Sequence, residues 1–244
     1  MITVPDTRIA LAEAADCFFG HPSRQLTVIG ITGTNGKTTT TFLVESILKQ
    51  AGYRPGVIGT IDYRFGDTCR PAPNTTPNAL VLQSIIKEMV DARVTHLIIE
   101  VSSHALAQSR IGSISFDVAA FTNLSRDHLD YHAGMADYFQ AKARLFSEYM
   151  KHTGTAVLPR VHGISEEREW LHLLQAICDK SCRKTIRWGE EEGADVWLRS
   201  YTTTLEQMDL VLTTPSGRHT LSSPLVGRYN IDNVLTVYGL CLAL

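Results

Sequence analysis

Short apolar runs alternate along the chain with longer segments in which apolar residues recur at helical spacing. The short runs predict buried strands and the longer segments predict amphipathic helices. We expect strands at Leu26–Ile31, Pro55–Thr60, Thr95–Val101, Asp117–Thr122, Thr155–Leu158 and Lys184–Trp188. We expect helices at Thr38–Gln50, Asn78–Ala92, Met135–Met150 and Ser165–Asp179. The alternation predicts an α/β fold, with a mostly parallel sheet flanked by helices.

Three segments do not follow this alternation. Residues 1–25 hold a short amphipathic helix that Asp6 or Thr7 would cap, and no candidate chemistry. The segment Asp62–Asn74 is polar and contains prolines, which predicts a loop. From Val196 to Leu225 the residues alternate around a Pro-Ser-Gly turn, which predicts a small antiparallel β patch near the C-terminus.

Inward-facing residues follow from the same periodicity. For the helix after the first strand we expect Phe42, Leu43, Ile47 and Leu48 in the core. For the helix that begins at Asn78 we expect Leu80, Ile85, Ile86 and Met89 there.

Composition excludes several classes of protein. The 244 residues suffice for one large α/β domain, and a net charge of −2 predicts neither nucleic-acid nor membrane binding. No apolar run reaches the ~18–20 residues of a membrane span. Five cysteines, without a signal peptide, predict reduced thiols and a cytoplasmic protein. Cys178, Cys182 and His172 make only half of a zinc motif, so we do not expect a metal there.

The first predicted strand leads into the sequence G-T-N-G-K-T-T, from Gly33 to Thr39. Glycines let backbone N–H groups approach an anion, and the helix N-terminus adds partial positive charge. Lys37 would reach the β- and γ-phosphates of a nucleotide, and Thr38 would ligate Mg²⁺. The generic phosphate loop has glycine where this chain has Ile31. The alternative is a glycine turn with an incidental lysine.

Two further segments adjoin predicted strand or helix ends. Glu100 ends a buried strand, where open α/β sheets bind ligands, and Mg²⁺ would neutralise its charge. The alternative partner for Glu100 is Arg110. Asn74-Thr75-Thr76-Pro77 precedes a helix. It is interpreted either as a helix cap or as a ligand-binding segment, and the two interpretations can coexist.

A polar stretch after the fourth predicted strand holds Asp127, His128, Asp130 and His132. The helix that follows carries Lys142 on the apolar side that Phe139 and Phe146 define. A lysine in that position either extends its head to solvent or has a function.

Five motifs in one order make the chain similar to the central ATP-binding domain of the Mur ligases, most closely to the tripeptide-forming members. They are G-T-N-G-K-T-T, N-T-T-P, E-V-S-S-H-A-L, T-N-L-S-R-D-H-L-D-Y-H and Y-F-Q-A-K-A-R-L-F. The resemblance implies a cytoplasmic peptidoglycan-precursor ligase. ATP would phosphorylate the free carboxylate of UDP-N-acetylmuramoyl-L-alanyl-D-glutamate, and the amine of meso-diaminopimelate or L-lysine would then attack the acyl phosphate. The first loop also resembles that of folylpolyglutamate synthases.

The resemblance assigns roles by position. ATP binding falls to Gly33, Thr34, Asn35, Gly36, Lys37, Thr38 and Thr39, with Asn230 and Asn233 near the adenine end, although a capping role would explain Asn230 equally well. Mg²⁺ ligands are Thr38, Glu100, His128 and Lys142, and the catalytic residues are Lys37, His128 and Lys142. The acceptor substrate falls to Asn74, Thr75, Thr76, Ser102, Gln108 and Arg110. His104, Asp127, Asp130 and His132 match motif positions as supporting residues.

In this family Lys142 would be carbamylated by CO₂. Only a neutral amine reacts, and at an ordinary pKa roughly one lysine in a few thousand is neutral at pH 7. An apolar helix face and nearby Mg²⁺ would lower that pKa. The inward position of Lys142 therefore fits the modification.

Relative to this family, residues 1–25 resemble a linker from a uridine-nucleotide domain, and residues 26–244 resemble the central domain. We therefore expect a monomer that binds ATP weakly and has little ligase activity without its flanking domains. Two alternatives stay open. One is a folylpolyglutamate-synthase-like ligase, and the other is a stand-alone ATP- and Mg²⁺-binding module.

Overall fold

The computed structural model describes residues 3–160, 166–180 and 184–244. Its strands are β1 (Thr27–Thr32), β2 (Pro55–Ile58), β3 (Asp62–Phe65), β4 (Thr68–Pro71), β5 (His96–Glu100), β6 (Phe116–Phe121), β7 (Met150–Pro159), β8 (Lys184–Gly189), β9 (Val196–Thr203), β10 (Met208–Thr214) and β11 (Gly217–Ser223). Its helices are α1 (Thr7–Phe18), η1 (Pro22–Gln25, 3-10), α2 (Lys37–Gln50), α3 (Ala79–Asp91), α4 (Ser103–Ala107), α5 (Met135–Ser147), α6 (Glu166–Lys180) and α7 (Arg228–Ala243).

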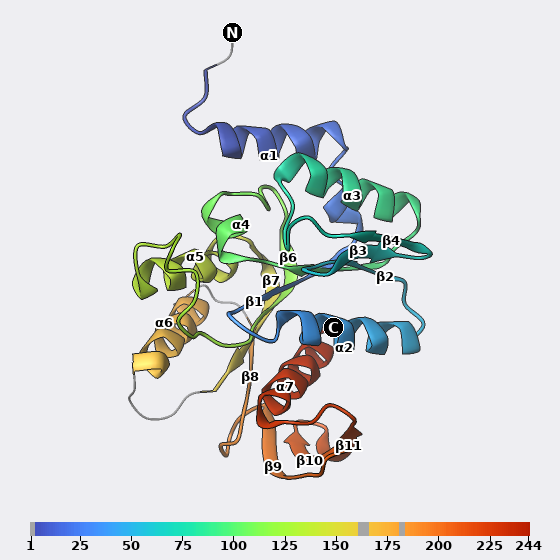
Figure 1. The fold of residues 1–244 in the computed structure, drawn as a ribbon, viewed down its shortest axis with the longest axis vertical. Helices are drawn as coiled ribbons and strands as arrows, with labels where there is room; N and C mark the ends of the chain where they lie inside the picture. Colours follow the sequence, from blue (N-terminus) through green and yellow to red (C-terminus); the bar gives the residue numbers. More distant parts are fainter. Residues whose placement is uncertain (1–2, 161–165, 181–183) are drawn as a thin grey trace.

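All strands of the described residues join one sheet, in the order β11-β10-β9-β8-β7-β6-β1-β5-β2-β3-β4 (Figure 1). Neighbouring strands from β9 through β1 to β2 are parallel. The pairs β9–β10 and β10–β11 at one end and β2–β3 and β3–β4 at the other are antiparallel. The predicted mostly parallel sheet and the C-terminal antiparallel patch are both confirmed.

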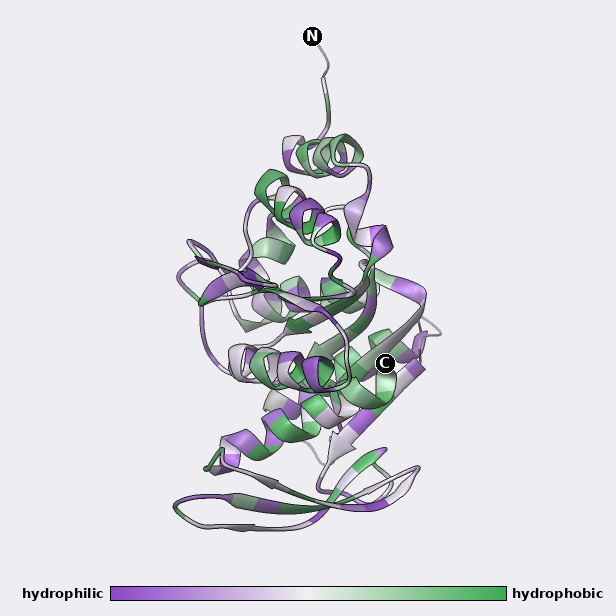
Figure 2. Cartoon of the chain, turned by 90° about the vertical axis from the view of Figure 1, so that its right-hand side faces the viewer, coloured by the Kyte–Doolittle hydropathy of each residue, from purple (hydrophilic) through white to green (hydrophobic). Residues whose placement is uncertain are grey.

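The sheet separates two apolar cores. One face packs against α3, α5 and α6, and the other packs against α2 and α7 (Figure 1). The alternation along β1 shows the division, because Val28 belongs to the first core while Ile29 and Ile31 belong to the second. Coloured by hydropathy, the strands between the helices are largely green, whereas polar positions gather on outer surfaces (Figure 2). β1 and its loop therefore lie at the centre of the molecule.

Several local predictions were wrong. The segment predicted as a loop from residue 62 to 74 contains β3 and β4, which extend the sheet as an antiparallel edge. The helix from Met135 ends at Ser147 rather than Met150, because Met150 already pairs with Phe116 at the start of β7. The strand predicted at Thr155–Leu158 is the second half of that longer strand.

The predicted core residues of two helices are confirmed in part, because Leu48 of α2 and Ile85, Ile86 and Met89 of α3 are buried, and Leu43 packs against the second core. In α2, Phe42 and Ile47 are both 42% exposed, whereas Thr40, Thr41, Val44 and Glu45 are buried with Leu48. In α3, Leu80 is 48% exposed. The predicted helix at Ser165–Asp179 is α6, although Ser165 lies outside the described residues.

The first helix packs beside α3 at one end of the molecule (Figure 1). Asp6 caps it, since the Asp6 carboxylate accepts hydrogen bonds from the backbone N–H groups of Arg8 and Ile9. Ala12 and Ala15 are buried in this contact. No helix of the described residues is long and apolar enough to cross a membrane.

Candidate functional site

The loop between β1 and α2 runs from Gly33 to Gly36, and its glycines are required by close packing. Gly33 has φ 141° and Gly36 has φ 83°, which L side chains rarely adopt. A Cβ on Gly33 would lie 2.0 Å from Thr122 Oγ1, and one on Gly36 would lie 2.1 Å from Asn233 Oδ1. Any larger residue at these two positions would displace the neighbouring strand end or helix.

The polypeptide after β6 holds this loop in place. Thr34 N–H donates to Asn123 O at 2.9 Å, and Asn35 N–H donates to Asn123 Oδ1 at 2.9 Å. Thr122 Oγ1 in turn donates to Asn35 O at 2.6 Å. Gly36, the residue directly before α2, offers no side-chain cap. The first N–H groups of α2 therefore remain available to an anion, such as a phosphate.

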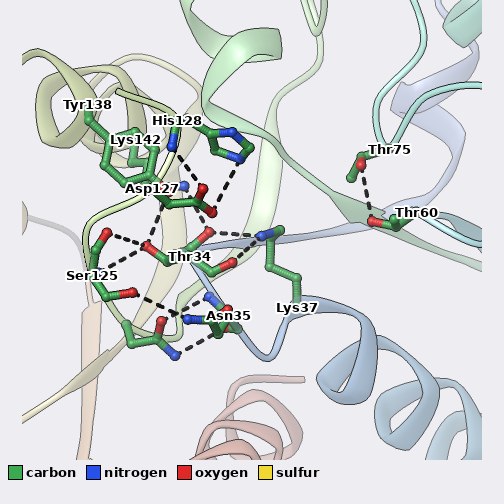
Figure 3. A network of polar contacts seen from close by, with 12 residues as sticks. Thr34, Asn35, Lys37, Thr60, Thr75, Ser125, Asp127, His128, Tyr138 and Lys142 are labelled. Carbon is green, nitrogen blue, oxygen red and sulfur yellow. Dashed lines mark hydrogen bonds and ion pairs between the residues drawn. The ribbon is translucent and has the colours of Figure 1, made fainter. Parts of the chain in front are cut away.

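Lys37 lies at the start of α2, and its side chain turns back over the loop (Figure 3). Its Nζ donates to Gly33 O at 2.9 Å and to Thr34 O at 2.7 Å. Burial lowers the pKa of Lys37, while the carboxylates of Glu100 and Asp127 act in the opposite direction. The Lys37 ammonium therefore lies where it could exchange its hydrogen bonds to the loop carbonyls for hydrogen bonds to a bound phosphate.

Glu100 is 1% exposed at the end of β5. Its Oε2 accepts hydrogen bonds from Thr38 Oγ1 at 3.0 Å and from Thr60 Oγ1 at 2.8 Å. The alternative partner, Arg110, instead donates to Thr76 O and to Gln108 Oε1, so the predicted alternative ion pair is wrong. One carboxylate and two hydroxyls form a hard oxygen set that fits Mg²⁺.

The Asn-Thr-Thr-Pro segment is not the cap of α3. That cap is Asn78, whose Oδ1 accepts from Val81 N–H at 3.1 Å. Thr76 Oγ1 instead donates to the backbone O of Glu100 at 2.7 Å, and Thr75 Oγ1 lies 3.1 Å from Thr60 Oγ1. The segment is therefore joined to the Glu100 strand, as a ligand-binding segment would be.

The remaining residues predicted for the acceptor substrate lie close together. Ser102 caps α4 by accepting from Ala105 N–H, and its N–H donates to Thr76 Oγ1. Gln108 Oε1 accepts from Arg110 Nε at 2.9 Å. Asn74, Gln108 and Arg110 line one cavity of about 290 Å³. The structure thus brings two motifs far apart in the sequence to one surface.

Lys142 is 1% exposed, so its head does not extend to solvent, and that alternative is wrong. Its Nζ donates to Gly33 O at 2.8 Å, the same oxygen that Lys37 contacts, and lies 4.4 Å from the centre of the Tyr138 ring. Burial and the nearby charge of Lys37 hold the pKa of Lys142 well below its ordinary value, and Asp127 opposes them only partly. The Lys142 amine is therefore buried beside the loop, in contact with its first glycine.

His128 has φ 53° and is 43% exposed in its side chain, with Nε2 3.6 Å from Asp127 Oδ2 (Figure 3). Its ring meets His104 edge to face, with centroids 5.0 Å apart. The buried ring of His132 bonds to Asp137 through Nδ1. Among the residues that the structure describes, no three His, Cys, Asp or Glu side chains are placed to hold a metal. His128 thus contacts Asp127 and His104. Cys182, the second cysteine of the half zinc motif, lies outside the described residues.

At the other side of the loop, α7 begins after Gly227, so Asn230 is not its cap. Asn230 Nδ2 donates to Val226 O at 2.8 Å, and Asn230 Oδ1 accepts from Asn233 Nδ2 at 3.0 Å. Asn233 reaches the loop at Gly36. The helix predicted to contribute to nucleotide binding therefore adjoins the loop, although its contacts there are structural.

Sequence reasoning missed four residues that shape this site: Thr60, Thr122, Asn123 and Tyr138, whose hydroxyl lies 3.1 Å from Thr34 Oγ1. Three of them follow the carboxyl ends of parallel strands, an edge at which side chains converge. Searching the residues after every predicted strand, and not only after the strand that ends at Glu100, would have identified Thr60, Thr122 and Asn123.

A glycine loop between a buried strand and a helix, with Lys37, Thr38 and a strand-end carboxylate around it, is typical of nucleotide-binding α/β domains. The family model for the Mur ligase middle domain matches residues 31–241, and the chain belongs to the Mur ligase family.

Curated relatives agree with this assignment. The UDP-N-acetylmuramoyl-L-alanyl-D-glutamate–2,6-diaminopimelate ligase of Geobacillus thermodenitrificans is 41% identical over 100% of this chain and 49% of its own length. The ligase of the same name from Geobacter sulfurreducens is 43% identical over 96% of this chain and 45% of its own length. The chain therefore spans about half the length of these relatives.

Solved structures show the same fold. A UDP-N-acetylmuramoyl-L-alanyl-D-glutamate–2,6-diaminopimelate ligase matches 96% of this chain and 47% of its own, with a TM-score of 0.81 and 27% identity. Folylpolyglutamate synthase of Mycobacterium tuberculosis matches 96% of this chain and 58% of its own, with a TM-score of 0.76 and 18% identity. The second likeness is one of fold alone.

Proposed function

We propose that this chain forms the ATP-binding part of a ligase that joins 2,6-diaminopimelate to UDP-N-acetylmuramoyl-L-alanyl-D-glutamate. The names and the 41–43% identity of the curated relatives support this reaction. L-Lysine is the alternative amine. Because the chain aligns with about half of each relative, we propose that it binds ATP and the acceptor, and that the other half of such a protein supplies the rest of the site. Residues 1–25 would then be the linker and residues 26–244 the central domain.

The observation that carries the proposal is the buried Glu100 carboxylate, which contacts the Thr38 hydroxyl at the start of α2. An ionised carboxylate buried with only hydroxyl partners is costly unless a cation offsets its charge. Mg²⁺ would reduce the negative charge between the nucleotide phosphates and the acceptor carboxylate. Thr38 and Glu100 would hold it directly, with His128 and a modified Lys142 as further ligands.

The remaining groups of the site would bind the nucleotide and orient the acceptor. The free N–H groups of α2 and the Lys37 ammonium would hold the β- and γ-phosphates. Thr75, Thr76, Ser102, Gln108 and Arg110 would hold the acceptor so that one oxygen of its free carboxylate attacks the γ-phosphorus and ADP leaves. The incoming amine would then attack the acyl carbon of the resulting acyl phosphate, and inorganic phosphate would leave.

We propose that Lys142 carries a carbamate, formed when its neutral amine adds to CO₂ and releases a proton. Burial supports this, because the lowered pKa of Lys142 increases the neutral fraction at pH 7. Native mass spectrometry of the chain with and without bicarbonate tests it. An added mass of one CO₂ on wild type, absent from a Lys142→Met variant, is the expected result, and no added mass on wild type contradicts it.

A thermal-shift measurement tests the ATP-binding proposal. ADP with Mg²⁺ should raise the melting temperature of the chain, and Lys37→Ala should abolish the shift. Lys87→Ala is the matched control, because Lys87 lies in α3 and pairs only with Asp91 in the salt bridges of the described residues. A wild-type chain that does not respond to ADP and Mg²⁺ overturns the proposal. Phosphate release with all substrates should be weak or absent in this chain alone.

We also propose that the protein acts as a monomer in the cytoplasm. The cysteines Cys17, Cys69, Cys178 and Cys241 are free thiols, which suits a reducing compartment. The substrates named for the relatives are soluble nucleotide-sugar and amino-acid compounds. Size-exclusion chromatography with light scattering tests the monomer, and a stable dimer at micromolar concentration contradicts it.

A further inference from the structure

The cavity of about 290 Å³ beside the Asn-Thr-Thr-Pro segment includes a residue from the first helix. Its wall contains Arg8 of α1, Asn74, Asn78 at the start of α3, Gln108 and Arg110. Figure 1 shows why such distant residues meet, because α1 lies along α3 and both lie above α4. The helix that precedes the ATP-binding region thus forms part of the proposed acceptor surface.

Positive charge accumulates in this cavity. The Arg110 guanidinium is fixed by two neutral acceptors, Thr76 O at 2.9 Å and Gln108 Oε1. Arg8 is exposed, and within residues 3–160, 166–180 and 184–244 neither arginine forms an ion pair. The N-terminus of α3, capped by Asn78, adds partial positive charge to the same wall. Two guanidinium groups that share a cavity repel each other unless an anion lies between them.

Asp6 does not provide that anion. Its Oδ1 accepts hydrogen bonds from the backbone N–H groups of Arg8 and Ile9 at the start of α1. It therefore serves as the cap of its own helix and lies outside the lining of the cavity. The long side chain of Arg8 remains able to turn toward a ligand that Arg110 already holds.

We propose that Arg8 and Arg110 together bind an anionic group of the acceptor substrate, either a carboxylate or a phosphate. This rests on the proposed function, since the nucleotide-sugar dipeptide carries both kinds of group. A guanidinium matches either anion with two parallel N–H donors, which a lysine does not reproduce. Arg110 supplies a fixed wall of the site, and Arg8 closes it from the solvent side. Helix α1 is then a part of the substrate site.

Isothermal titration calorimetry of the 244-residue chain tests the proposal with three probes. UDP carries only phosphates, L-alanyl-D-glutamate carries only carboxylates, and the complete UDP-N-acetylmuramoyl-L-alanyl-D-glutamate carries both. Arg8→Gln should weaken binding of the complete substrate about tenfold or more, since it removes a charged hydrogen bond. Arg8→Lys should restore part of the loss. The smaller probe that shows the same loss identifies the bound group.

The matched control is Arg24→Gln, which removes the same charge from an exposed residue of η1 outside the cavity. It should leave all three affinities unchanged. Arg8→Gln should not unfold α1, because a positive charge in the first turn is unfavourable to the helix dipole. Unchanged melting temperatures of both variants verify this.

Equal affinities of the Arg8→Gln and Arg24→Gln variants overturn the proposal, and so does a wild-type chain that binds none of the probes. ADP with Mg²⁺ is titrated into the same proteins. A chain that fails to bind ADP overturns the proposed function, whereas the role of Arg8 is judged only from the other three probes. The two failures are therefore distinguishable.

Discussion

At the scale of single residues, two glycines with the same backbone conformation face different surroundings. Gly36 and Gly52 both have φ 83°. A Cβ on Gly36 would lie 2.1 Å from Asn233 Oδ1, whereas a Cβ on Gly52, at the end of α2, meets nothing within 4 Å. The pair separates the cost of the backbone conformation from the cost of a steric collision.

Gly52→Ala should lower the free energy of unfolding by about 1 kcal/mol, from strain alone. Gly36→Ala should lower it by about 2 kcal/mol or more, because Asn233 must also break its bond to Asn230. It should also abolish the thermal shift with ADP and Mg²⁺. Urea unfolding measures both variants. Asn233→Ala added to Gly36→Ala should recover part of the loss, and equal losses for the two glycine variants would contradict this account.

Lys142 allows a prediction about stability that does not depend on its role in the reaction. Burying the polar head of a lysine is costly in either protonation state, and replacing it by an apolar side chain of similar length removes that cost. Lys142→Met should therefore keep or raise the free energy of unfolding, by about 1 kcal/mol, while removing any ligase activity. Urea unfolding at pH 7 measures it. A loss above about 1 kcal/mol would mean that the bond from Lys142 to Gly33 O outweighs the cost of burying the polar amine.

At the scale of elements, the central strands were predictable because they are buried on both faces and therefore read as continuous apolar runs. The edge strands were not. In β3 only alternate residues are buried, and β4 is largely exposed, so polar residues and a proline make the pair resemble a loop. The start of β7 was missed for a similar reason, since its first residues are partly exposed.

The candidate site also has a part that the sequence predicts and a part that it does not. Local pattern and the positions of strand ends were enough to predict the roles of Gly36, Lys37 and Glu100 in the site, and the burial of Lys142. The bond from Thr60 to Glu100 depends on which strands are neighbours. Local sequence does not encode that adjacency.

Glu45 of α2, which is 6% exposed, should make the free energy of unfolding depend on pH. Burial raises the pKa of Glu45, but hydrogen bonds from Arg64 and Lys49 outweigh it, so the pKa lies below its ordinary value. The ionised carboxylate thus stabilises the folded chain above the unfolded pKa of about 4.3, and this contribution is lost as the pH falls through the lower folded pKa.

Glu45→Gln should lower the free energy of unfolding by about 1–2 kcal/mol at pH 7. The difference from wild type should shrink as the pH falls below about 4. Urea unfolding between pH 7 and 3 measures it. Glu88→Gln is the control, because its pair with Arg70 is exposed and screened by solvent, and should contribute less than the buried Glu45 pairs. A difference that stays constant with pH would exclude this role for the carboxylate.

At the scale of the whole molecule, the two cores share one sheet, and the loop Gly33–Gly36 follows a central strand of that sheet. Val28 and Ile29 are neighbours in β1 but face opposite cores. Leu82 of α3 and Leu240 of α7 are both fully buried, one in each core. Because both cores pack on strands of one continuous sheet, we expect the domain to unfold in one cooperative step.

Leu82→Ala and Leu240→Ala should each lower the free energy of unfolding by about 2–5 kcal/mol, with coincident transitions in near- and far-ultraviolet circular dichroism. ADP with Mg²⁺ at ~100 times its dissociation constant should then add about 2.7 kcal/mol to both variants alike, because a ligand that binds only the folded state stabilises the whole cooperative unit. Chelation of Mg²⁺ by EDTA should reduce this gain in both, since the negative charge of the phosphates and of Glu100, which Thr38 contacts, would no longer be offset. If Leu240→Ala instead gave two transitions, and ADP shifted only one of them, the α7 side would be a separate unit, and the nucleotide would report on only part of the fold.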